Sequence, residues 1–326
     1  MSSAVPEAGP IAVLGAGAWG TALAIQAARA GGEVILWARD PARAAAIAAA
    51  RENPRLPGAR LPEQVRVTAA LPETAAALLL AVPLQQLRGV AARLSGGVPL
   101  VCCAKGVEAG TLALPLEILA ELHPRTPRAV LTGPNFAHEI AAGLPAASVI
   151  AGTDPDLREW LIARLGTPAF RLYGNDDPVG AQIGGAAKNV IAIAAGAVMG
   201  AGLGENARAA LITRGLAERG RLAVALGGRG ETVMGLSGLG DLLLTCTGPA
   251  SRNYSLGVAL GRGELLADVL AARAAVTEGV ATAPALVARA GATDLPICRA
   301  VAALLEGRTT LARAIAELLA RRLRDE

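Results

Sequence analysis

Short apolar runs alternate with helical patterns between residues 11 and 175. Short apolar runs bounded by turn residues predict buried strands, and apolar residues recurring every three or four positions predict helices. Because a helical stretch follows most of the strands, the pattern favours a mostly parallel sheet covered on both faces. The predicted strands are 11–15, 33–39, 65–68, 78–82, 99–104, 129–132, 147–151 and 170–173, and the predicted helices are 19–30, 41–51, 84–94, 112–122, 136–142 and 155–165.

The strand signals stop after Asp176, and long Ala- and Leu-rich helical patterns run from Gly184 to the end of the chain. Glycines at Gly227–Gly228 and Gly261–Gly263 predict breaks between helices. A chain of 326 residues is long enough for two domains. We therefore expect an α/β domain over 1–180 and an all-α domain over 181–326.

Composition describes a globular protein, since 53% of the residues are hydrophobic and 18% are charged. The net charge of +4 comes from scattered basic residues, which argues against a nucleic-acid partner. The uncharged run 8–28 is long enough to span a bilayer, but its glycines divide it into a strand, a turn and a helix. Residues 1–7 carry no positive segment typical of a secretory signal. We expect a cytoplasmic protein without a membrane-inserted segment.

The four cysteines lack the spacing of a metal site, so we expect buried thiols and no metal. The basic residues indicate candidate site positions. Of the 31 lysines and arginines only two are lysines, Lys105 and Lys188. An ammonium group can lose its proton at accessible pH and a guanidinium cannot. Both lysines are therefore candidate site residues, with chance survival as the alternative.

A G-x-G-x-x-G pattern, formed by Gly15, Gly17 and Gly20, lies between a predicted strand and a predicted helix. In this context the glycines permit a tight turn, the approach of a pyrophosphate to the helix N-terminus, and close helix–strand packing. The pattern predicts a Rossmann-type dinucleotide site. In an NAD site an acidic residue about 20 positions further on holds the ribose. Here Arg39 ends the next predicted strand and Asp40 follows, so NADP is expected to be usable; the alternative is a solvated Arg39.

Two further strand ends carry candidate groups. Lys105 follows one predicted strand, and Gly133-Pro134-Asn135-Phe136 follows another and opens a helix. Ligands of open parallel sheets bind at the carboxyl ends of strands, and a helix N-terminus offers free N–H groups. We expect these two segments to line one crevice, and the alternative for the glycine and proline is an ordinary turn.

The helical half carries three candidate segments. Lys188 lies in a long apolar helix, where lost hydration lowers the pKa of an amine toward the range useful for proton transfer. Asp241 and Thr245 are four residues apart and share a helix face. Ser251-Arg252-Asn253 suits a small phosphate, with a capping loop as the alternative.

With these segments assembled, the chain from about Ile11 to Leu323 resembles the soluble NAD(P)-dependent glycerol-3-phosphate dehydrogenases of bacteria. The segments that carry the resemblance are Gly15–Thr21, GPNFAHEIAAGL from Gly133, GGAAKNVIAIAA from Gly184, NARAALITRGLAE from Asn206, GLGDLLLTCT from Gly238, Ser251–Asn253 and VTEG from Val276. Ala18 departs from the family, which often has Ser there, and Asn135 stands where Ser or Thr is common.

The resemblance implies that Lys188 is the catalytic proton acceptor, with Lys105 and Asp241 beside it. The substrate residues that it implies are Lys105, Gly133, Asn135, Lys188, Asp241, Ser251, Arg252 and Asn253. The cofactor residues are Gly15, Gly17, Ala18, Trp19, Gly20, Arg39, Lys105, Ala137, Arg252, Val276 and Glu278. His138 is expected to be a helix surface residue.

The expected activity is the reversible NADH- or NADPH-dependent reduction of dihydroxyacetone phosphate to sn-glycerol 3-phosphate, which the resemblance links to glycerophospholipid synthesis. A homodimer is possible. A 2-hydroxy or 3-hydroxy acid dehydrogenase remains an alternative, because Ser251-Arg252-Asn253 does not distinguish phosphate from carboxylate. A non-catalytic NADP-binding sensor is a second alternative, against which the two lone lysines argue.

Overall fold

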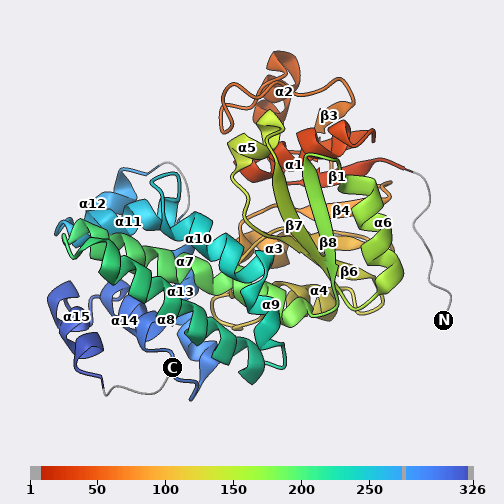
Figure 1. Cartoon of the computed structure of the whole chain (residues 1–326). Helices are drawn as coiled ribbons and strands as arrows, with labels where there is room; N and C mark the ends of the chain where they lie inside the picture. The colour runs from red at the N-terminus through yellow and green to blue at the C-terminus, as the bar shows by residue number, and fades with distance from the viewer. Residues whose placement is uncertain (1–8, 274–276, 322–326) are drawn as a thin grey trace. The chain divides into compact units, whose positions relative to one another are not determined.

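The computed structural model describes residues 9–273 and 277–321, which fall into two units (Figure 1). Unit 1 comprises Met1–Lys105 and Ala113–Gln182. Unit 2 comprises Gly106–Leu112 and Ile183–Glu326. No sequence pattern indicated that the short segment Gly106–Leu112 groups with the helical half.

Unit 1 is built on an eight-stranded sheet with the order β3-β2-β1-β4-β5-β6-β7-β8. Neighbouring strands are parallel except β6 and β7, which are antiparallel. The predicted α/β class and all eight predicted strands are confirmed. The strands are β1 Ile11–Leu14, β2 Val34–Trp37, β3 Val65–Thr68, β4 Ala77–Leu80, β5 Leu100–Cys102, β6 Arg128–Thr132, β7 Ala146–Ala151 and β8 Phe170–Asn175.

Helices cover both faces of this sheet, as the buried, apolar strands require. Alternate strand residues, among them Val13, Leu36 and Leu79, form one core with residues of α1, α2, α5 and α6. On the second face α4 contacts β5 and β6 and packs against α3. The helices of unit 1 are α1 Ala18–Arg29, α2 Pro41–Ala50, α3 Leu84–Ala91, α4 Pro115–Leu122, α5 Ala137–Ala142 and α6 Pro155–Leu165.

Several predicted boundaries in this half are wrong: the helix expected to reach Leu94 ends at Ala91, and the strand expected to reach Ala104 ends at Cys102. Two further boundaries are wrong for clear local reasons. The helix expected from Leu112 begins at Pro115, because Leu112 has a φ of 62°, outside the right-handed helical region. The strand expected to reach Arg39 ends at Trp37, and Asp40 already caps the next helix.

Among the described residues of unit 2 every regular element is a helix, as predicted for the second half, and Gly106–Leu112 forms turns and coil. Its elements are α7 Pro178–Gly200, α8 Gly204–Ala225, α9 Gly230–Met234, the π-helical turn η1 Leu236–Gly240, α10 Asp241–Cys246, α11 Arg252–Gly261, α12 Leu266–Ala271, α13 Glu278–Ala290, α14 Pro296–Leu305 and α15 Leu311–Leu319. The predicted break at Gly227–Gly228 follows α8, and the one at Gly261–Gly263 begins at the last residue of α11.

Helix α7 starts earlier than the predicted Gly184. Its first residue is Pro178, and the carboxylate of Asp177 accepts a hydrogen bond from Gly180 N at 2.8 Å. Asp followed by Pro is a helix start signal, since the carboxylate caps free N–H groups and proline needs no N–H at that position. The division between the units after Gln182 therefore lies inside a continuous helix.

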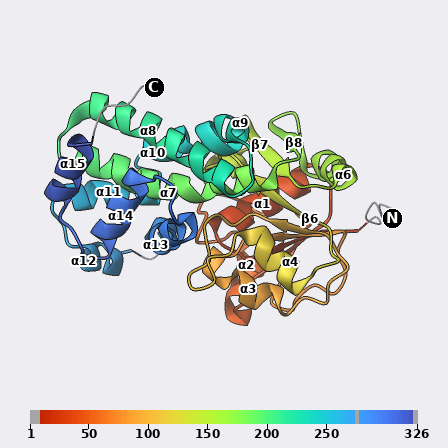
Figure 2. The same ribbon diagram turned by 90° about the horizontal axis from the view of Figure 1, so that it is seen from below.

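Helices α7 and α11 lie side by side through glycines (Figure 2). A Cβ on Gly196 would lie 2.0 Å from Tyr254 O, and one on Gly257 would lie 2.0 Å from Ile193 O. Each helix therefore brings its backbone against the backbone of the other, an approach that a side chain at either glycine would prevent.

By length and composition α7 is also apolar enough to cross a membrane. However, 78% of its most apolar window is buried inside the protein, which is typical of a core helix in a soluble protein.

Candidate functional site

The glycine loop of unit 1 connects β1 to α1. Gly15 has a φ of 118°, and a Cβ on Gly20 would lie 1.8 Å from Gly15 O, so both positions require glycine. Gly17 differs, because no protein atom lies within 4 Å of its Cβ position. Gly17 is also the N-cap of α1 and offers no side chain to the free N–H groups there. This open space at an uncapped helix N-terminus fits a pyrophosphate.

Two side chains hold the loop in place, and sequence reasoning missed both. The Asn53 amide donates to Ala16 O at 3.0 Å and to Thr21 Oγ1 at 2.6 Å, and the guanidinium of Arg43 also donates to Ala16 O. Asn53 is fully buried, which is unusual for asparagine and marks a hydrogen-bonded polar group. No local pattern indicates a contact between residues that are 37 positions apart.

The residues after β2 bear on the choice of dinucleotide. Arg39 is exposed. The carboxylate of Asp40 accepts hydrogen bonds from Ala42 N at 2.9 Å and Arg43 N at 3.3 Å, and so caps α2. An acidic side chain used as a helix cap has less capacity to bind a ribose hydroxyl than a free one.

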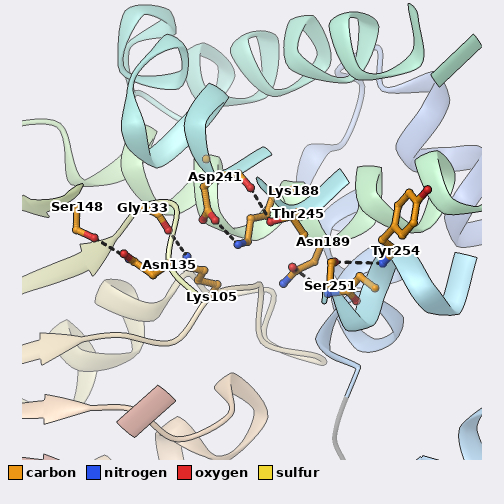
Figure 3. A network of polar contacts seen from close by, with 12 residues as sticks. Lys105, Gly133, Asn135, Ser148, Lys188, Asn189, Asp241, Thr245, Ser251 and Tyr254 are labelled. Atoms are coloured by element: carbon orange, nitrogen blue, oxygen red, sulfur yellow. Dashed lines mark hydrogen bonds and ion pairs between the residues drawn. The ribbon is translucent and has the colours of Figure 1, made fainter. Parts of the chain in front are cut away.

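Lys105, Gly133 and Asn135 form a second cluster in unit 1 (Figure 3). Lys105 Nζ donates to Gly133 O at 3.1 Å, and Asn135 Nδ2 donates to Ser148 Oγ at 2.6 Å. The prediction that these two strand ends converge is confirmed. Asn135 Oδ1 is a buried atom without a hydrogen-bond partner among the described residues, so the cluster retains an acceptor suited to a polar ligand.

The helix after this cluster, α5, begins at Ala137, whose side chain is half-buried, as are those of Ala18 and Trp19 at the start of α1. His138 is exposed on α5 and stacks on Phe136 with 5.7 Å between ring centroids. The prediction that His138 is a helix surface residue is confirmed.

In unit 2, the ammonium of Lys188 on α7 contacts the carboxylate of Asp241 on α10 (Figure 3). Lys188 is 9% exposed and Asp241 is fully buried. Thr245 Oγ1 donates to Asp241 O at 2.5 Å, which confirms that the two residues share one helix. Burial disfavours the ammonium form of Lys188, and the neighbouring carboxylate favours it. The sequence indicated the apolar surroundings but did not indicate the carboxylate.

A second polar group of unit 2 joins α7 to α11. Asn253 Nδ2 donates to Asn189 Oδ1 at 2.9 Å, and Asn253 Oδ1 accepts from Gly279 N at 3.0 Å. Ser251 caps α11 by accepting from Tyr254 N at 3.2 Å, so the capping alternative applies to this residue. Arg252 is exposed at the first turn of the same helix.

Of the two predicted cofactor residues near α13, Glu278 is its first residue and is half-buried. Val276 lies outside the described residues. All four cysteines are buried, as predicted. Across residues 9–273 and 277–321, no three His, Cys, Asp or Glu side chains are grouped to hold a metal.

A Rossmann-type sheet with a glycine loop, followed by a helical half with a buried lysine–carboxylate pair, defines the class: a dinucleotide-dependent dehydrogenase with two domains. Within that class, the chain belongs to the NAD-dependent glycerol-3-phosphate dehydrogenase family. The model of the family's N-terminus matches residues 10–158, and the model of its C-terminus matches residues 177–316.

Individual relatives agree with this membership. Glycerol-3-phosphate dehydrogenase [NAD(P)+] of Acidiphilium cryptum is 61% identical over 97% of this chain and 98% of its own length. The Gluconobacter oxydans enzyme of the same name is 54% identical over 90% of this chain and 92% of its own. The crystal structure of glycerol-3-phosphate dehydrogenase from Coxiella burnetii is 38% identical, with a TM-score of 0.92 over 96% of this chain and 99% of that one.

Proposed function

We propose that the protein catalyses the reversible reduction of dihydroxyacetone phosphate to sn-glycerol 3-phosphate with NADH or NADPH, and so supplies glycerophospholipid synthesis. The buried Lys188–Asp241 pair carries the proposal, because it puts a proton-carrying group in the helical half of a chain that both family models match. The bound nicotinamide supplies the hydride, and the protein supplies orientation and a proton.

For the cofactor, the open space at Gly17 and the uncapped start of α1 support pyrophosphate binding. Exposed Arg39 would meet a 2'-phosphate, since Asp40 is engaged as a helix cap. The proposed cofactor residues are Gly15, Gly17, Ala18, Trp19, Gly20, Arg39, Lys105, Ala137, Arg252, Val276 and Glu278.

Lys188 is the proposed catalytic acid and base. In reduction its ammonium donates a proton to the alkoxide that develops on the carbonyl oxygen. In oxidation its neutral amine accepts the proton of the C2 hydroxyl. Asp241, which contacts Nζ, would orient the amine and stabilise its protonated form.

The remaining proposed substrate residues divide by unit. Lys105, Gly133 and Asn135 in unit 1 would bind the carbonyl and hydroxyl groups, supported by the unpartnered Asn135 Oδ1. In unit 2, Ser251, Arg252 and Asn253 would bind the phosphate, with exposed Arg252 as the charge partner.

We further propose that residues 1–180 act as the NAD(P)-binding domain and residues 181–326 as the substrate-binding and catalytic domain. A cytoplasmic homodimer accords with the activity, and light scattering of the pure protein tests the dimer.

A substrate comparison tests the activity. Purified protein is mixed with NADH and either dihydroxyacetone phosphate or a set of 2-oxo and 3-oxo acids, and the loss of NADH absorbance is followed. We expect turnover with the phosphate ester alone. Turnover only with the acids would make the protein a hydroxy acid dehydrogenase, and cofactor binding without turnover would make it a sensor.

A further inference from the structure

The core of unit 2 contains a guanidinium that the proposed reaction does not use. Arg219 lies on α8 and is fully buried. Its Nη2 donates to Gly184 O at 2.5 Å, but Nε and Nη1 have no hydrogen-bond partner among the described residues. A buried charge with unpaired donors is destabilising, and charged groups cost more than neutral ones. Such a group needs a compensating interaction.

The position of Arg219 suggests which interaction that is. Gly184, which accepts its hydrogen bond, lies one helical turn before Lys188 on α7, and residues four apart share a helix face. A Cβ on Gly184 would lie 2.4 Å from Ser237 O, so η1, which leads into α10, is packed against this same turn. The guanidinium is thus anchored on the α7 turn that carries Lys188, against the segment that leads to Asp241.

The charges in this region act on one another. Burial lowers the pKa of Arg219 to about 10, and the carboxylate of Asp241 opposes that shift. Arg219 therefore remains positive at neutral pH, within electrostatic range of the carboxylate that contacts Lys188. Burial raises the pKa of the Cys246 thiol to about 12, with Arg219 and Lys188 acting against the rise.

Two thiols, Glu218 and Arg208 also lie in this region. Burial raises the pKa of Cys298 on α14 well above its usual value, so both nearby thiols are neutral at pH 7. The Glu218 carboxylate accepts hydrogen bonds from Ile297 N at 2.6 Å and Cys298 N at 3.1 Å, at the start of α14. The positive charge of Arg208 also lowers the pKa of Cys246, but less than the charges of Arg219 and Lys188 do.

We propose that Arg219 is a positioning residue for the proposed reaction: its charge competes with Lys188 for the carboxylate of Asp241, and so allows Lys188 to release its proton. Without this second cation, less positive charge lies near Lys188 and Asp241, so the ammonium form of Lys188 is held more firmly and the residue is a poorer base. With it, the amine of Lys188 can alternate between its charged and neutral forms. The inference rests on the proposed role of Lys188.

The test is the pH dependence of kcat/KM in both directions for Arg219→Gln, Arg219→Met and Arg219→Lys. Glutamine removes the charge and can still donate to Gly184 O, whereas methionine removes both the charge and the donor. In both neutral variants we expect the midpoint of the pH profile of kcat/KM to rise by about one pH unit, for oxidation and for reduction. The reason is that Lys188 then holds its proton more firmly. At pH 7 oxidation should be about tenfold slower, with KM changed less than about twofold. Arg219→Lys, which keeps the charge, should restore most of the midpoint.

Arg221→Gln is the matched control, since Arg221 lies two residues further along α8, is exposed, and donates to Asp294 O at 3.0 Å. It should keep the wild-type midpoints. If the two neutral Arg219 variants are slower but keep the wild-type pH midpoints, Arg219 has only a structural role and the proposal is overturned. Neutral variants with wild-type rates would overturn it as well. If one neutral variant fails to fold, the other still gives the midpoint. A wild-type protein inactive with dihydroxyacetone phosphate would instead refute the proposed function, so the two failures are distinguishable.

Discussion

At the scale of single residues, each lysine of the protein has a defined polar partner. Lys105 Nζ donates to Gly133 O at 3.1 Å, and Lys188 Nζ contacts the carboxylate of Asp241. Arginines such as Arg39 and Arg252, in contrast, carry charge on the exposed surface, whereas Arg219 is buried. The distribution follows chemistry, because lysine can exchange a proton near neutrality and arginine offers a permanent charge with several donors.

Arg39→Ala tests the 2'-phosphate contact. Removing a charge-assisted hydrogen bond should weaken NADPH binding by about 1.5 to 3 kcal/mol and leave NADH binding nearly unchanged. Calorimetric titration with each dinucleotide measures both values. Arg171→Ala, an exposed arginine on β8 at the other edge of the sheet, serves as the control for net charge. Equal losses for the two dinucleotides would place the 2'-phosphate elsewhere.

Arg252→Ala tests the phosphate site. The variant should raise KM for dihydroxyacetone phosphate roughly 10-fold or more and largely abolish discrimination against unphosphorylated dihydroxyacetone, because phosphate binding energy orients the reacting carbon. Steady-state kinetics with both ketones provide the measurement. Arg262→Ala, at the other end of α11, is the control. Discrimination that survives in Arg252→Ala would show that another group binds the phosphate.

At the scale of elements, the glycine contacts between α7 and α11 set the spacing of two helices that carry proposed site residues. Lys188 and Asn189 lie on α7, and Asn253 lies on α11. The Asn253–Asn189 hydrogen bond of 2.9 Å depends on this close approach. Packing in this part of unit 2 and the geometry of the site are therefore coupled.

Gly257→Ala should destabilise the protein by about 1 to 3 kcal/mol, because the added methyl group would lie 2.0 Å from Ile193 O. Gly220→Ala is the matched control. Gly220 lies inside α8 with no atom within 4 Å of its Cβ position, so alanine there should stabilise by about 0.5 to 1 kcal/mol. Urea unfolding of the two variants should give opposite signs, and equal signs would contradict the close packing.

Local patterns predicted most elements, because strands and amphipathic helices repeat with short periods. The glycine loop was also predictable, since its three glycines meet backbone requirements within a few residues. Asp177 and Pro178 are a local signal for the start of α7, whereas the Gly184–Gly185 pair predicts a later start. The contacts of Asn53 and Arg219 were not predictable, because their partners are 37 and 35 positions away.

At the scale of the whole molecule, each unit supplies part of the chemistry that the proposed reaction needs. Unit 1 has the dinucleotide loop, and unit 2 has the buried Lys188–Asp241 pair, whose members are 53 positions apart. The sequence singled out both residues but gave no reason to pair them, because tertiary packing alone brings α7 and α10 together. Each unit also contains two buried cysteines, so the reactivity of these thiols measures how closed the core of each unit is.

The native protein should react very slowly with a thiol reagent at pH 8. Burial raises the pKa of Cys103 and Cys298 well above their usual value and that of Cys246 to about 12, so the reactive thiolate is scarce. Mass spectrometry should find all four thiols labelled in guanidinium chloride. Rapid labelling of one native unit would show that its core is more open than the structure indicates.

The central claim is that Lys188 carries the proton, and Lys188→Arg tests it most directly. Arginine keeps the positive charge beside Asp241, but a guanidinium cannot act as a base near neutrality. Turnover should fall by roughly 10²-fold to 10⁴-fold in both directions, while NADH binding and the folded state are retained. A variant that binds NADH and turns over close to the wild-type rate would contradict the account, and the base would then have to be sought at Lys105 or Asp241.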